Sequence, residues 1–195
     1  MKLKTLFVLA GMFTGLVCKA QNKSSIPEIN EERKRLESNG MLVLGSWALG
    51  NMVWGGIGAS RTTGARKGFH QMNMYWNTVN LAIAGLGYFN AKKHQTEGSL
   101  WKSLQAQQKT EKILLFNAAL DAGYMAGGLY LMERGKRRQN DQLVGFGNAV
   151  ILQGAFLLVF DGILYSLQVK NKAKFKPWID KVNISTSGIS YKVEF

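Results

Sequence analysis

The chain has 195 residues, 46% of them hydrophobic, and its 25 Lys and Arg against 12 Asp and Glu give a net charge of +13. This length fits one domain. One cysteine, two isolated histidines and no nucleophile, phosphate-loop or metal-binding motif argue against a disulfide framework, a metal centre and an enzyme. We therefore expect neither a cofactor nor a bound metal.

The first 20 residues have the pattern of a signal peptide. Lys2 and Lys4 precede an apolar stretch at 6–17, and the small residue Ala20 stands before the polar Gln21. A charged start, a short apolar stretch and a small residue at the cleavage point are typical of an export signal. Cleavage after Ala20 is the prediction, and a retained membrane anchor is the alternative.

A polar amphipathic lead-in helix is predicted within residues 21–40. Ser25 is placed as an N-cap, Pro27 lies early in the first turn, and Glu28 stands three residues after the serine. This spacing is that of a capping box, which satisfies backbone N–H groups at a helix start. The helix is expected to carry charged residues through Leu36.

Residues 41–169 are predicted to form a four-helix transmembrane bundle. Four long windows contain no charged residues other than Asp121 and Asp161. Apolar and polar residues do not alternate in them as they do in half-buried strands. Each window is long enough to cross a bilayer as a helix. The windows are 38–60, 68–91, 113–132 and 142–169. The alternative is an exported soluble bundle whose buried helices are equally apolar.

The four windows fall into two tandem hairpins with related sequences. Gly68-Phe69 recurs 77 residues later as Gly145-Phe146, and Gly55-Gly56 recurs 72 residues later as Gly127-Gly128. A duplication of this kind relates parallel repeats by an axis along the membrane normal. The alternative is that small residues simply recur wherever helices pack closely.

Arginine is concentrated in the two short connections within the hairpins. These residues are Arg61, Arg66, Arg134, Arg137 and Arg138. The positive-inside bias places them on the cytoplasmic side, near anionic headgroups of the lipid bilayer, and places the C-terminus outside. We therefore predict a bacterial inner-membrane protein that does not bind nucleic acid, although lysines after the fourth window oppose this orientation.

Polar side chains recur on single faces of the predicted spans and form the candidate site. At 1.5 Å per residue the two acids lie at a similar depth of about 10 Å. Acids inside a membrane mark functional sites by default, so a ligand, ion or proton site is one hypothesis. Hydrogen-bonded packing between helices is the other. The candidates are Asp121, Asp161, Asn51, Asn77, Asn80 and Asn117.

The pattern changes to strand-like alternation in the basic C-terminal segment, 170–195. A turn at Ser187-Gly188 predicts a β-hairpin with Ile184 opposite Tyr191 and Val182 opposite Val193. A lone hairpin is barely stable in water, so its apolar face is expected to pack on the bundle or on a protein partner. The Phe-terminated tail also suits an outer-membrane β-barrel, which is the weaker alternative.

The chain resembles the small exported four-span proteins grouped in families of unknown function. The resemblance rests on the Cys-Lys-Ala-Gln end of the signal, the paired Gly- and Asn-rich spans and the Phe-terminated tail. It implies no activity. The sequence thus predicts an all-α membrane bundle with a C-terminal β-hairpin and a structural or interaction role; the alternative function is a small transporter or an ion- or ligand-binding protein.

Overall fold

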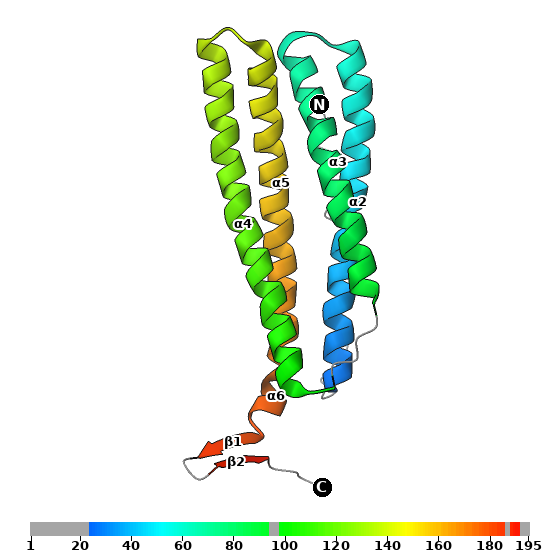
Figure 1. Ribbon diagram of the computed structural model, residues 1–195, viewed down its shortest axis with the longest axis vertical. Helices are drawn as coiled ribbons and strands as arrows, with labels where there is room; N and C mark the ends of the chain where they lie inside the picture. The colour runs from blue at the N-terminus through cyan, green and yellow to red at the C-terminus, as the bar shows by residue number, and fades with distance from the viewer. Residues whose placement is uncertain (1–23, 94–97, 186–187, 192–195) are drawn as a thin grey trace.

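The computed structural model describes residues 24–93, 98–185 and 188–191, so the predicted signal peptide lies outside the described residues. Four long helices run antiparallel to their neighbours in sequence (Figure 1). A 3-10 turn, a short helix and two short strands follow. The elements are α2 (Ile26–Arg61), α3 (Gly64–Lys92), α4 (Leu100–Arg137), α5 (Asp141–Lys172), η3 (Ala173–Phe175), α6 (Lys176–Ile179), β1 (Val182–Ser185) and β2 (Gly188–Tyr191).

Helices α2 and α4 extend well beyond the apolar windows. The predicted lead-in segment is continuous with the first window in α2, because no proline follows Pro27 in this helix and Gly40 at the junction stays helical where it is buried against Leu164. The capping box is confirmed: the Ser25 side chain accepts from the Glu28 N–H, and the Glu28 carboxylate accepts from the Ser25 N–H. Ser99 caps α4 and Asn140 caps α5 in the same manner, with a side-chain oxygen on a first-turn N–H.

Glycines bring the helices into close contact at the end that carries the arginine connections. A Cβ on Gly55 of α2 would lie 2.7 Å from the carbonyl oxygen of His70 and 3.1 Å from the Met74 nitrogen. A Cβ on Gly128 of α4 would lie 2.8 Å from the carbonyl oxygen of Gly147 and 2.9 Å from the nitrogen of Ile151. The two hairpins, α2–α3 and α4–α5, therefore share one internal packing arrangement.

These contacts show that the hairpins are structural repeats. Between α2 and α4 the equivalent glycines are 73 positions apart, and their partners on α3 and α5 are 77 apart. The predicted offset of 72 for the first pair is wrong by one residue, because Gly55 matches Gly128 and not Gly127. The two glycines of Gly127-Gly128 look alike in sequence, and only the packing distinguishes them.

The repeats also meet each other at equivalent positions. A Cβ on Gly145 would lie 2.1 Å from the Ala65 carbonyl oxygen, and one on Gly68 would lie 2.8 Å from the Gln142 carbonyl oxygen. Since Ala65 and Gln142 are themselves 77 apart, the α3–α5 contact is reciprocal. Reciprocal contacts of this kind define a two-fold relation, here internal to one chain and directed along the bundle.

The predicted fold class is wrong in its C-terminal part. The described chain is an all-α bundle, and its strands are two four-residue segments, β1 and β2, which pair with each other beyond the end of the bundle (Figure 1). The predicted register also fails, because Val182 and not Ile184 lies opposite Tyr191. The pairing is centred one residue earlier in the chain than expected. A two-stranded pair of this size does not change the fold class, which is all-α.

Polarity is reversed between the interior and the surface of the bundle. Asn73, Asn77 and Gln153 have no exposed surface, whereas Leu49, on the outside of α2, is 53% exposed. By length and composition two helical segments, Ile26–Arg61 and Asp141–Ile179, are apolar enough to cross a membrane. The other large hydrophobic residues that are at least half exposed in the long helices are Leu42, Val53, Ile57, Tyr75, Val79, Ile83, Leu86, Phe89, Trp101, Ile113, Leu115, Phe116, Leu129, Tyr130 and Val159.

Candidate functional site

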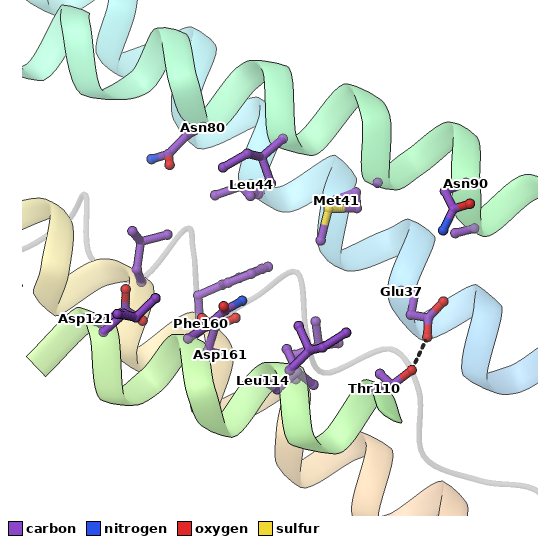
Figure 2. Close-up of a pocket in the computed structure, with 18 of the residues that line it drawn as sticks. Glu37, Met41, Leu44, Asn80, Asn90, Thr110, Leu114, Asp121, Phe160 and Asp161 are labelled. Atoms are coloured by element: carbon purple, nitrogen blue, oxygen red, sulfur yellow. Dashed lines mark hydrogen bonds between the residues drawn. The ribbon is translucent and has the colours of Figure 1, made fainter. Parts of the chain in front are cut away.

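A cleft of about 850 Å³ lies between the two hairpins, with residues of α2 and α3 on one side and of α4 and α5 on the other (Figure 2). It opens along α3 and α4, which make few contacts with each other. The two-fold relation makes the α3–α4 interface equivalent to the interface between α2 and α5. There the Trp47 ring stacks on Phe156 with 3.8 Å between centroids, and its N–H donates to Gln153. The cleft therefore exists because one of two related interfaces is open.

The deep end of the cleft holds the two acids. Asp121 is 3% exposed and Asp161 is 6% exposed, and their carboxyl groups lie within hydrogen-bonding reach of each other. No donor among the described residues reaches Oδ2 of Asp121. Trp76 of α3 and Tyr124 of α4 also line this end, with ring centroids 4.9 Å apart in an edge-to-face contact. Two carboxylates in contact repel each other, so the pair is stable with a shared proton or a bound donor.

The first hairpin shows that packing alone does not require these acids. By the offsets of 73 and 77, Asp121 and Asp161 are equivalent to Ala48 and Ala84, which are also buried. The same position between paired helices is therefore filled by two methyl groups in one repeat and by two carboxyl groups in the other. The repeat therefore packs with or without acids at this position.

The predicted polar residues separate into two groups. Asn80 and Asn117 line the cleft together with the acids. Asn51 and Asn77 do not line it; each donates to a carbonyl one turn back in its own helix, to Trp47 at 2.9 Å and to Asn73 at 2.8 Å. Their role is local, because the amide is satisfied within the helix that carries it.

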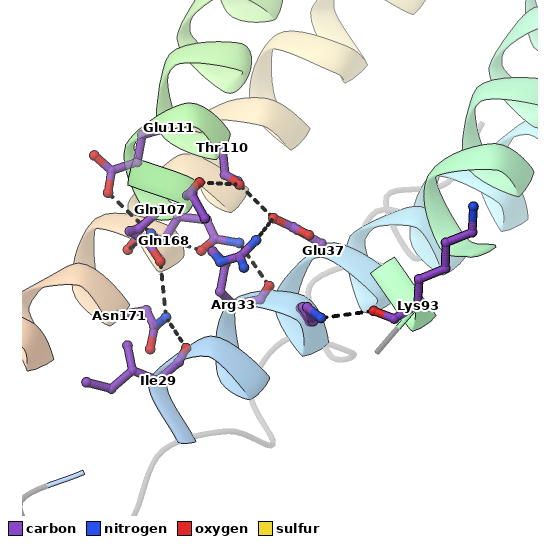
Figure 3. A network of polar contacts seen from close by, with 11 residues as sticks. Ile29, Arg33, Glu37, Lys93, Gln107, Thr110, Glu111, Gln168 and Asn171 are labelled. Carbon is purple, nitrogen blue, oxygen red and sulfur yellow. Dashed lines mark hydrogen bonds and ion pairs between the residues drawn. The ribbon is translucent and has the colours of Figure 1, made fainter. Parts of the chain in front are cut away.

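The opposite end of the cleft is a charged rim. Arg33 donates to Glu37 at 3.3 Å, and Glu37 also accepts from Thr110 across the bundle at 2.7 Å. Lys34 donates to the backbone carbonyl of Lys93, which ties α2 to the end of α3 (Figure 3). With Lys109, the rim has four cationic side chains, Arg33, Lys34, Lys93 and Lys109, against the single carboxylate of Glu37.

A buried amide network closes the bundle beyond the rim (Figure 3). Gln107 donates to the carbonyl and to the side chain of Gln168, and Gln168 donates to the carbonyl of Arg33. Asn171 donates to the carbonyl of Ile29. Because both glutamines are fully buried, these bonds hold the charged segments of α2 and α4 against the end of the α5 window.

The rim and Trp76 were not predicted from the sequence. Arg33, Lys34 and Lys109 stand in ordinary charged helical segments, and Trp76 stands in an apolar window. Nothing in their local pattern distinguishes them from solvated or lipid-facing residues. These residues come together because of the way the two hairpins are arranged around the two-fold axis. The glycine repeats in the sequence indicated the two hairpins but not this arrangement.

The described residues contain no group of three or more His, Cys, Asp or Glu that could hold a metal ion. Fold and cleft together define a duplicated four-helix bundle with an acidic pair in an open interface. The chain belongs to a family described as a Family of unknown function (DUF6992), matched over residues 43–162. That range includes both acids and the Trp76–Tyr124 pair but excludes Arg33 and Lys34. Searches of curated proteins and of solved structures gave no match.

Proposed function

We propose that this protein crosses a membrane four times and binds an amphipathic molecule in the cleft between α3 and α4. The observation that carries the proposal is the reversed polarity of the bundle. Asparagine, glutamine and aspartate side chains are buried in the interior beside an apolar cluster, while large apolar side chains such as Leu86, 75% exposed, cover the outside of every long helix. Water penalises so much exposed apolar surface, and lipid does not.

The positions of the charges support four spans. Each of the four apolar windows is bounded by charged residues at both ends. Some of these basic side chains lie over aromatic rings near the helix ends. Lys92 lies over the Tyr88 ring and Arg134 over the Tyr130 ring. Aromatic and snorkelling basic residues are typical of membrane–water interfaces. Hydropathy alone underestimates α3 and α4 because buried polar residues, which do not face lipid, lower their averages.

The orientation follows from the arginines. Arg61, Arg66, Arg134, Arg137 and Arg138 belong to the ends of helices that meet at one end of the bundle. We infer an inner-membrane location with this end in the cytoplasm, next to anionic headgroups, and with the cleft rim and the C-terminal segment outside.

Cysteine labelling tests the spans and their orientation. In a Cys18→Ser background, Thr63→Cys probes the α2–α3 connection and Gly98→Cys probes the connection at the opposite end. We expect a membrane-impermeant maleimide to label Gly98→Cys in intact cells and Thr63→Cys only after permeabilisation. Equal labelling of both positions in intact cells would contradict four spans in this orientation.

A structural role alone leaves the open cleft and the unpartnered carboxyl oxygen without an explanation. The binding role is tested with cis-parinaric acid, a fluorescent fatty acid, added to the purified full chain. Ile83 and Ile57 are both 51% exposed, but only Ile83 lines the cleft. We expect saturable binding to the parent chain and to Ile57→Trp, and at least tenfold weaker binding to Ile83→Trp. Equal affinity of the two variants would refute the cleft as the binding site.

The outer-membrane β-barrel alternative finds no support, because the four predicted spans fold into helices.

A further inference from the structure

The two ends of the cleft differ in charge and in hydrogen-bonding character, and this difference restricts what the cleft can hold. The rim has an excess of cations, and its carboxylate, Glu37, is already engaged by Arg33 and Thr110. An acidic group at the rim is therefore attracted without having to compete with a free carboxylate.

The wall between the two ends is apolar. Lys109 at the rim and Asp121 at the deep end are twelve positions apart on α4, which corresponds to about 18 Å. Leu44, Leu114 and Phe160 are buried residues that line this length of the cleft. An unbranched hydrocarbon chain suits a long apolar cleft of this kind, because burying it requires no polar partner.

The deep end offers acceptors. Two carboxyl groups offer several oxygen lone pairs, and apart from a proton shared with Asp161, Oδ2 of Asp121 meets no donor among the described residues. A buried acceptor without a donor is costly, and a ligand that supplies the donor removes that cost. The alanines at the equivalent positions of the first hairpin show that the fold itself does not need acceptors here.

We propose that the cleft binds a single-chain amphipath that places an acidic group at the rim and a terminal hydrogen-bond donor, such as a hydroxyl, at Asp121 and Asp161. This inference rests on the proposed membrane-binding function and adds the chemical class of its ligand. It differs from simple lipid binding in requiring a polar group at both ends of the hydrocarbon chain.

The test is displacement of cis-parinaric acid from the purified full chain by three matched probes: palmitic acid, ω-hydroxypalmitic acid and cetyl alcohol. We expect ω-hydroxypalmitic acid to displace the reporter at about tenfold lower concentration than palmitic acid, as one added charge-assisted hydrogen bond would give. We expect cetyl alcohol, which lacks the acidic group, to be weaker than either acid.

Variants separate the two ends. Asp121→Ala with Asp161→Ala copies the first hairpin and should bring the ratio between the two acids close to one, and the single change Asp121→Ala should lower this ratio if the double variant folds poorly. Lys93→Gln with Lys109→Gln should weaken both acids relative to cetyl alcohol. Gln105→Ala, outside the cleft, is the control and should preserve every ratio.

The outcomes distinguish this inference from the proposed function. If the reporter binds saturably but the terminal hydroxyl gives no advantage in the parent chain, or the advantage survives the alanine variants unchanged, the ligand class is wrong and cleft binding stands. If the reporter does not bind saturably at all, the proposed function itself fails.

Discussion

Oγ1 of Thr110 donates a 2.7 Å hydrogen bond to Oε1 of Glu37, and these two residues occupy equivalent positions, 73 apart, in the two hairpins. Asn30 and Ser103, also 73 apart, form a second such bond of the same length. Residues related by a two-fold axis touch each other only where they lie close to it. The axis therefore passes between α2 and α4 at the rim end and between α3 and α5 at the glycine end.

The Thr110–Glu37 bond is expected to stabilise the contact between the repeats. Thr110→Val keeps the shape of the side chain and removes the donor, so it should lower the free energy of unfolding by about 1.5 kcal/mol, a typical value for a hydrogen bond to a charged group. The measurement is a denaturation curve in detergent. Thr78→Val is the matched control, because the Thr78 hydroxyl bonds only to its own helix, at Met74, and its loss should change stability less.

The glycine contact between α3 and α5 should tolerate no side chain. In Gly145→Ala the new Cβ would lie 2.1 Å from the Ala65 carbonyl oxygen and 2.5 Å from the Phe69 nitrogen, both rigid backbone atoms. The helices must separate, and we expect a loss of about 3 kcal/mol or more.

Gly123→Ala provides the control, since nothing lies within 4 Å of its Cβ position. Alanine favours helix over glycine by up to about 1 kcal/mol, so this variant should be slightly more stable than the parent. Thermal melting of the two variants in one detergent checks both expectations, and equal melting temperatures would contradict the close α3–α5 contact.

Much of the fold could be predicted because charge and capping are local signals. The charge-free windows lie within the four long helices, and the Ser25–Glu28 capping box starts α2 as expected. The continuity of α2 through the lead-in segment was not predicted. The change from charged to apolar residues near Gly40 has the composition of a boundary between two helices, although the helix continues through it. The register of β1 and β2 failed because sequence alone did not fix the turn.

The candidate site was predicted only in part, for a physical reason. Asp121, Asp161, Asn80 and Asn117 share the cleft, whereas Asn51 and Asn77 bond to carbonyls in their own helices. An asparagine on a helix face can line the cleft or donate to a carbonyl of its own helix, and its spacing in the sequence is the same in both cases. Which one it takes depends on whether the neighbouring helix lies close, and that is a tertiary property.

The buried amide network should be sensitive to loss of one member. In Gln168→Leu, the Gln107 amide loses its bond to the Gln168 side chain but keeps the bond to the Gln168 backbone carbonyl, and the Arg33 carbonyl loses its side-chain donor. Two buried hydrogen bonds are lost at about 1 kcal/mol each, so we expect a loss of about 2 kcal/mol in a denaturation curve. Gln108→Leu, an exposed position on α4, is the control and should stay within about 0.5 kcal/mol of the parent. Similar effects of the two changes would show that the network contributes nothing specific.

The substitution Leu49→Arg distinguishes a membrane bundle from a soluble one. Leu49 is 53% exposed and lies midway along the charge-free window 38–60. On a surface facing water, this change should alter stability by no more than about 0.5 kcal/mol. At the centre of a membrane-spanning helix, arginine costs about 3 kcal/mol. We therefore expect Leu49→Arg to reduce strongly the fraction of the chain that remains in membranes after alkaline carbonate extraction.

Gln105→Arg is the control for this change. Gln105 is exposed on the part of α4 that precedes the apolar window, where an added charge meets water in either case. Its recovery in the carbonate-resistant fraction should equal that of the parent chain. A Leu49→Arg protein that is recovered in full, with an unchanged melting temperature, would mean that α2 faces water at its midpoint. The reversed polarity of the bundle would then need a protein partner, not lipid, to cover its apolar surface.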